Sequence, residues 1–153
     1  MNKYKLLAMV LICFSMLGCA ATAPRGSTAL EMQQKQFFQP DQNSVALYIY
    51  RGQEGLLNQD VITKRKIWVN GDELGSLIAN SYFYTTTSEG VITIETESEF
   101  GKNELTFQAD GGRIYFVEQN LKMGVLVSGA DLKLAYDKKG KEAILSSRLL
   151  KKQ

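Results

Sequence analysis

The sequence has no histidine, and only two cysteines and one tryptophan occur among its 153 residues. Histidine is the side chain that most often serves as a general base and as a metal ligand, so both roles would fall to other groups. The sequence also contains no Gly-x-Ser-x-Gly elbow, no Ser-x-x-Lys pair and no glycine-rich phosphate loop. Gly71, Gly75 and Gly90 are better explained as turn residues. Carboxylates are the groups that remain for an enzyme mechanism.

Long apolar runs are also scarce, and the one at the N-terminus covers only residues 6–16. It follows a basic start that contains Lys3 and Lys5, and it precedes a short stretch of small residues. A spanning helix needs about 20 apolar residues, so this run is too short to cross a membrane. A basic start, a short apolar core and a small-residue cleavage site are typical of a secretory signal.

The end of this signal, Leu17-Gly18-Cys19, resembles the lipobox of bacterial lipoproteins. In that motif the cysteine thiol receives a diacylglyceryl group and the chain is cut just before it. We therefore predict a signal peptide over residues 1–18, cleavage between Gly18 and Cys19, and a covalent lipid on Cys19. Met16 stands where leucine is commoner, which leaves open a plain secretory signal and a released soluble protein.

The predicted processing removes the remaining thiol chemistry and the net charge. Cys13 would leave with the signal and Cys19 would carry lipid, so no thiol would remain for a disulfide, a metal cluster or a nucleophile. Lys3 and Lys5 would leave as well, and the charge of the mature chain would then balance, although the full chain carries +2. A neutral chain gives no electrostatic case for nucleic acid. We expect no cofactor other than the lipid.

Residues 19–43 are predicted to be a flexible tether, because they are small, polar and interrupted by proline and glycine. Residues 30–38 could form a short helix that Pro40 would end. Ala20, in place of an aspartate, resembles the sorting pattern for the periplasmic face of the outer membrane. In an organism with one membrane, the same anchor would place the protein on the cell membrane.

From residue 44 onward the pattern is that of strands separated by turns. The clearest turn is Asn70-Gly71 between two apolar segments, because a type I′ hairpin requires positive φ at both positions. Short strands at this spacing predict an all-β fold, an antiparallel β-sandwich of about eight strands over residues 44–153. Residues 142–152 are predicted to form a C-terminal helix with Leu145 and Leu149 on one face. The predicted strand segments are residues 45–51, 67–74, 82–87, 91–99, 104–109, 113–119, 124–127 and 132–136.

Five aromatic side chains are the candidate partner-binding residues. Alternation along a strand places Tyr48 and Tyr50 on one face, and Tyr82 and Tyr84 likewise share a face. Trp68 stands just before the hairpin turn. The first interpretation is that one aromatic face is core and the other is covered by the C-terminal helix. The alternative is a partly exposed patch, since tyrosine and tryptophan are enriched at protein interfaces.

Two charged segments are weaker candidates. Glu95, Glu97 and Glu99 recur at a spacing of two, so they would project from one strand face, either as a cation site or as a solvated surface. The basic run at residues 64–66 could meet anionic lipid head groups or could simply be solvated. Neither segment forms the pattern of a catalytic or metal site, and we predict none.

Several segments together resemble a family of small bacterial lipoproteins known only as a domain of unknown function. The resemblance implies a sandwich similar to the PEGA-type β-domains of envelope proteins, and it implies no chemistry. One turn departs from the family pattern: residues 87–91 replace a Pro-Gly turn that is followed by histidine. The segments that carry the resemblance are the lipobox, Lys35-Gln36-Phe37, residues 47–51, residues 69–77, Ser81-Tyr82-Phe83 and the Gly-Lys-Glu-Ala sequence of residues 140–143.

These observations predict a membrane-anchored, non-catalytic envelope lipoprotein whose sandwich binds a partner in the periplasm. We expect the membrane itself and another envelope protein as partners, with no nucleic acid and no small-molecule substrate. One alternative is an assembly accessory that only positions a larger envelope complex. A second is a carboxylate-dependent hydrolase acting on envelope glycan.

Overall fold

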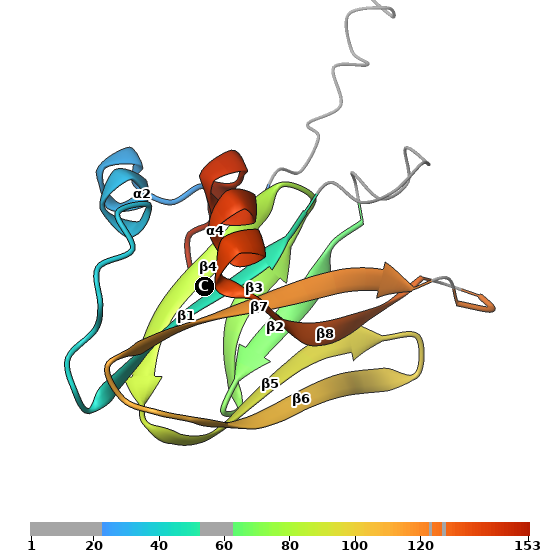
Figure 1. Cartoon of the computed structure of the whole chain (residues 1–153). Helices are drawn as coiled ribbons and strands as arrows, with labels where there is room; N and C mark the ends of the chain where they lie inside the picture. Colours follow the sequence, from blue (N-terminus) through green and yellow to red (C-terminus); the bar gives the residue numbers. More distant parts are fainter. Residues whose placement is uncertain (1–22, 53–62, 123, 127) are drawn as a thin grey trace, which may run out of the picture.

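The computed structural model describes residues 23–52, 63–122, 124–126 and 128–153 of the chain (Figure 1). These residues form two β-sheets that pack face to face, with two helices on one side of the sandwich. The predicted signal of residues 1–18 and the predicted lipid site at Cys19 lie outside the described residues. Neither described helix is both long enough and apolar enough to cross a membrane.

From residue 65 onward, the elements follow one another along the chain with short connections. Nine strands and two helices are found within the described residues. In chain order they are α2 (Thr28–Gln34), β1 (Ser44–Arg51), β2 (Arg65–Val69), β3 (Asp72–Leu77), β4 (Ser81–Ser88), β5 (Gly90–Ser98), β6 (Gly101–Ala109), β7 (Arg113–Lys122), β8 (Gly129–Ala135), α4 (Asp137–Ser146) and β9 (Arg148–Leu149).

One sheet has the strand order β8-β7-β1-β4-β9 and the other has the order β3-β2-β5-β6. The predicted all-β sandwich is therefore confirmed. The pairing is not wholly antiparallel, because β1 is parallel to β7 and β4 is parallel to β9. A parallel pair needs a long crossover, and in the chain the strands β2 to β6 lie between β1 and β7.

Strand β1 lies in the middle of the five-stranded sheet, and both of its faces are covered. Val45, Leu47 and Ile49 point into the core between the sheets and are fully buried. Tyr48 and Tyr50 point to the opposite face and belong to a second buried cluster beneath the helices. A strand that is buried on both faces needs a nearly continuous apolar run, which is what residues 45–50 provide.

The hairpin between β2 and β3 turns at Asn70 and Gly71, as the sequence predicts. Their φ angles are 51° and 90°, both in the region that a type I′ turn requires. The side chain of Asn70 also accepts a hydrogen bond from the backbone N–H of Thr93 at 2.9 Å. This contact joins the turn to β5 of the same sheet.

The described part of the predicted tether, residues 23–43, makes contacts with the sandwich. Arg25 forms a β-bridge with Leu150, and the N–H of Gly26 donates to the carbonyl of Leu149 at 2.9 Å. Helix α2 follows and ends at Gln34, well before Pro40. These backbone contacts are made with the far end of the chain, which local composition cannot reveal.

Two other segments differ from prediction. Helix α4 begins at Asp137 and ends at Ser146, because the residues after it pair with β4 as strand β9. Its buried positions are Gly140 and Ile144, whereas Leu145 is exposed. Residues 124–126, which were expected to lie in a strand, belong to the connection between β7 and β8.

Candidate functional site

The tyrosines of the predicted aromatic patch lie side by side on β1 and β4. The register places Tyr48 opposite Tyr84 and Tyr50 opposite Tyr82. The ring centroids of Tyr48 and Tyr84 are 5.0 Å apart in an edge-to-face arrangement. Phe116 of β7 stacks on Tyr48 at 5.3 Å. Such pairs add to the free energy gained by burying the rings.

This cluster is covered, so three of the five candidates present no surface to a partner. Tyr48 and Tyr50 are 1% exposed and Tyr82 is fully buried, while Tyr84 is half-buried. The alternative of an exposed patch at Tyr48, Tyr50 and Tyr82 is therefore wrong, and these rings belong to a covered face, as in the first interpretation. Ile144 of α4 and Phe37, which follows α2, pack on the rings from outside. The predicted helix cover forms, but a second segment shares it.

Burial also sets the chemistry of these phenols. The Tyr48 hydroxyl donates to the backbone carbonyl of Gln34 at 2.7 Å, which ties α2 to the sheet. Desolvation raises the pKa of Tyr48 far above its ordinary value, and nearby phenols add to the rise. Desolvation likewise raises the pKa of Tyr82, and the charge of Glu31 adds to it. The hydroxyl groups of Tyr48 and Tyr82 therefore stay protonated, and the two side chains contribute to the packing between the helices and the sheet.

A buried carboxylate fastens α2 to the C-terminal segment. Glu31 is 9% exposed and pairs with Lys35 at 2.9 Å and with Arg25 at 3.8 Å. Lys35 also donates to the carbonyl of Ser147 at 2.7 Å. Burial alone would raise the pKa of Glu31, but the hydrogen bonds from Lys35 and the Leu149 N–H, together with both positive charges, lower it.

Trp68 lies on the other side of the molecule, on the outer face of the four-stranded sheet. It is half-buried, and the Lys102 ammonium sits 3.9 Å from its ring centroid. Lys66 lies 5.9 Å from the same ring. Ion pairs hold both lysines, Lys66 with Glu73 at 3.0 Å and Lys102 with Glu95 at 3.1 Å. We call these five residues the Trp68 face.

Glu95, Glu97 and Glu99 serve three separate structural contacts. Glu95 pairs with Lys102, and Glu97 accepts the backbone N–H of Lys66 at 2.9 Å. Glu99 lies beyond the end of β5 and accepts the N–H groups of Val125 and Leu126. Because these carboxylates face different partners, the structure does not gather them around a common point.

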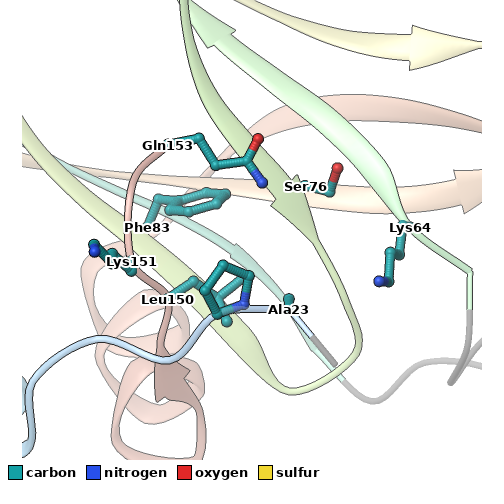
Figure 2. Close-up of a pocket in the computed structure, with 8 residues that line it drawn as sticks. Ala23, Lys64, Ser76, Phe83, Leu150, Lys151 and Gln153 are labelled. Atoms are coloured by element: carbon teal, nitrogen blue, oxygen red, sulfur yellow. The ribbon is translucent and has the colours of Figure 1, made fainter. Parts of the chain in front are cut away.

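The basic run at residues 64–66 is also divided among different contacts. The guanidinium of Arg65 donates to the carbonyl of Ser128, and Lys66 belongs to the Trp68 face. Lys64 lines a shallow pocket of about 130 Å³ at the open seam between the two sheets. Figure 2 shows Lys64 and Lys151 on two sides of this pocket, with Ala23 between them.

Sequence reasoning missed one buried charge cluster. Glu118 of β7 is 2% exposed, and its carboxylate pairs with Lys139 of α4 at 2.9 Å and with Lys133 of β8 at 3.2 Å. An acidic residue that follows the apolar run of residues 114–117 is the only local signal. Its lysine partners come from separate elements, which a single sequence does not bring together.

Comparison with known proteins places these features in a family. A family model described as "Protein of unknown function (DUF2846)" matches residues 41–130. A relative from Haemophilus influenzae (strain Rd), described as "Uncharacterized protein", is 33% identical over 129 residues, which cover 84% of this chain and 74% of the relative. No solved structure matches the chain. Because the match spans more than half of its length, this chain belongs to the DUF2846 family of proteins of unknown function.

Proposed function

We propose that the protein is a lipid-anchored envelope lipoprotein whose β-sandwich is a non-catalytic binding module. The observation that carries this proposal is the order of a basic start, a short apolar run and Leu17-Gly18-Cys19. Such an order favours export and attachment of lipid at Cys19. Ala20 favours the periplasmic face of the outer membrane, or the cell membrane in an organism with one membrane.

The contacts of the acidic side chains favour binding over catalysis. General acid–base catalysis needs a group that can reach a substrate and exchange a proton with it. Glu95 is paired with a lysine, Glu99 holds a loop by its backbone, and Glu118 is buried between two lysines. Each of these three carboxylates is thus engaged in holding the sandwich together.

The Trp68 face is the surface that we propose for a protein partner. Its ring is the one large aromatic side chain on the outer side of β2, and ion pairs with Glu73 and Glu95 fix the lysines around it. Tryptophan combines a large apolar area with a polar N–H group, which suits protein interfaces. This surface, which combines an aromatic ring with charged side chains, suits a protein partner in the envelope. We also propose that the sandwich is similar to the PEGA-type β-domains of envelope proteins.

Lipid attachment is tested by replacing Cys19 with alanine. Metabolic labelling with a radioactive fatty acid should mark the natural chain and fail to mark Cys19→Ala, which should accumulate as uncut precursor. Cys13→Ala is the matched control, because Cys13 lies in the segment that processing removes. Unchanged labelling of Cys19→Ala would remove the anchor from the proposal.

The partner is tested by crosslinking inside cells. A photoreactive amino acid at Glu104, which is exposed and pairs across the strands with Glu95, should capture a recurrent envelope protein. The same probe at Met32, exposed on α2, is the control. Capture at Glu104 should be lost in a Trp68→Ser background. Equal capture at Met32, or recovery of glycan fragments at Glu104, would contradict the proposed face.

A further inference from the structure

Three large apolar side chains project into solvent from two neighbouring turns. Phe100 lies in the turn between β5 and β6 and is 77% exposed. Val125 and Leu126 lie in the connection between β7 and β8 and are 88% and 81% exposed. We call these three residues the apolar tip. Clustered exposure of this kind has a cost in water and marks an interaction site.

The two turns of the apolar tip are held to each other by specific contacts. The Glu99 carboxylate accepts the backbone N–H of Val125 at 2.8 Å and also accepts the N–H of Leu126. At Gly129, a Cβ would approach the backbone nitrogen of Glu99 to 3.1 Å, so the two connections pack closely. The tip is therefore a built surface and not a chance exposure of separate loops.

The tip lies at the end of the sandwich where β1, β5 and β7 finish and where β2, β6 and β8 begin. The register shows this directly, since Lys122 pairs with Gly129 and Ser98 pairs with Gly101. Figure 1 shows the β5–β6 and β7–β8 connections on the same side of the molecule. Arg65, at the start of β2, donates to the carbonyl of Ser128 beside the tip.

The first described residue of the chain lies near the same end of the strands, but beside β3 and β9, at the opposite edge of the two sheets from the tip. Lys64, the neighbour of Arg65, lines the seam pocket together with Ala23 (Figure 2). Ala23 comes four positions after Cys19, and a fully extended chain over four positions spans at most about 14 Å. A lipid on Cys19 would hold this end of the sandwich, where the tip also lies, close to the bilayer surface.

We infer that the apolar tip inserts into the surface of the lipid bilayer that holds Cys19. The inference rests on the lipid anchor proposed above, and it adds an orientation to it. Apolar and aromatic side chains enter the boundary between head groups and acyl chains when an anchor keeps them near. With the tip in the bilayer, the Trp68 face points sideways along the membrane, where a neighbouring protein can reach it.

The test places a fluorescent probe at the tip of the full-length, lipidated protein. Because the processed chain would carry no free thiol, Leu126→Cys offers a single attachment point for a polarity-sensitive dye. Asn43→Cys is the control, since Asn43 is exposed and precedes β1 at the opposite end of the strands. Both proteins are reconstituted in vesicles of phosphatidylethanolamine and phosphatidylglycerol that carry a nitroxide on the acyl chains.

At position 126 the emission should shift to the blue and be quenched by the nitroxide, whereas the probe at position 43 should do neither. A probe at 126 that stays in water on a protein with lipid at Cys19 would overturn this inference alone. Absence of lipid at Cys19 would overturn the anchor as well. A blue shift without quenching would indicate protein contact at the tip, from a partner or a second copy, and would also overturn it.

A second variant keeps the inference falsifiable. With the dye at Phe100→Cys, replacing Val125 and Leu126 by aspartate should reverse the shift and the quenching. The replaced side chains are exposed, so the circular-dichroism spectrum should stay that of a folded β-protein. A Phe100 probe that remains quenched in the aspartate variant would contradict insertion of the tip.

Discussion

The two outer faces of the sandwich are treated in opposite ways. The outer face of the five-stranded sheet carries aromatic rings and is covered by α2 and α4, so that Tyr48 and Phe116 are 1% exposed. The outer face of the four-stranded sheet has no helix in the described residues. It shows Trp68 between two lysines, and Glu104 is exposed. The covered face stabilises the fold, and the open face is the one that we propose for binding.

This difference is already visible in the alternation of residues along the strands. In β1 every residue from Val45 to Arg51 is buried, which requires cover on both sides. In β6, apolar Leu105 and Phe107 alternate with polar Glu104 and Thr106, which is typical of a strand with one solvated face. The pattern along a strand therefore indicates whether one or both of its faces are buried, although it does not identify the segments that cover them.

The largest effect should come from emptying the covered face. Phe116→Ala removes a ring that packs against Tyr48 and Phe37, and the loss should be about 3–5 kcal/mol in the free energy of unfolding. Urea denaturation followed by circular dichroism measures it. Trp68→Ala on the open face is the comparison and should cost clearly less. Equal losses would mean that the two faces do not differ as described.

The next effect should come from the contact between α4 and the sheet. A Cβ at Gly140 would stand 2.2 Å from a ring atom of Phe116, so Gly140→Ala must push the helix away. Alanine normally favours a helix over glycine, yet here we expect a net loss of about 1–3 kcal/mol from overpacking. Lys138→Ala, exposed on the same helix, is the control. A more stable Gly140→Ala protein would contradict the packing of the cover.

A smaller, pH-dependent effect should come from the link between α2 and the C-terminal segment. Because the pKa of Glu31 is lowered from 4.5 in the folded protein, its ionised form adds stability above that value, and the contribution disappears as the pH falls through the lower folded pKa. Glu31→Gln should therefore be less stable than the natural chain at neutral pH and equal to it in strong acid. Glu142→Gln, exposed on α4, is the control. A difference that persists unchanged in strong acid would rule out this ion pair as its cause.

The smallest effect should be on the open face. Lys102→Met removes the ammonium group above Trp68 and the ion pair with Glu95, which should cost only about 0.5–1 kcal/mol at an exposed site. The chain has one tryptophan, so its emission spectrum reports on this face alone and should shift on the substitution. Lys138→Met is the control, and its spectrum should match that of the natural chain. A Lys102→Met spectrum that also matches would show that the lysine does not cover the ring.

The strands were predictable because their signals are local. Alternation marks β4 to β7, and Asn70-Gly71 marks the β2–β3 turn through the φ angles that its residues tolerate. The parallel pair of β1 and β7 was not predictable, since it depends on the path of the chain through the second sheet. The apolar run at residues 124–127 looks like a strand by composition, but its described residues lie in a connection that Glu99 holds.

The candidate site was predictable only in part. Alternation places Tyr48 and Tyr50 on one face, but their burial depends on Phe37 and Ile144, which come from opposite ends of the chain. Helix α2 has only seven residues, too few for a clear periodic signal, and its long-range contacts to Ser147 leave no trace in local sequence. In α4 the apolar periodicity predicts that Leu145 faces the sheet. In the structure Gly140 faces it instead, because the helix lies close to the ring of Phe116.

The most direct test of the account is the mass of the N-terminal peptide of the protein purified from its native membranes. The account predicts that the chain begins at Cys19 and that this residue carries the mass of a diacylglyceryl group. A chain that still begins at Met1, or one that begins at Cys19 with an unmodified thiol, would contradict it.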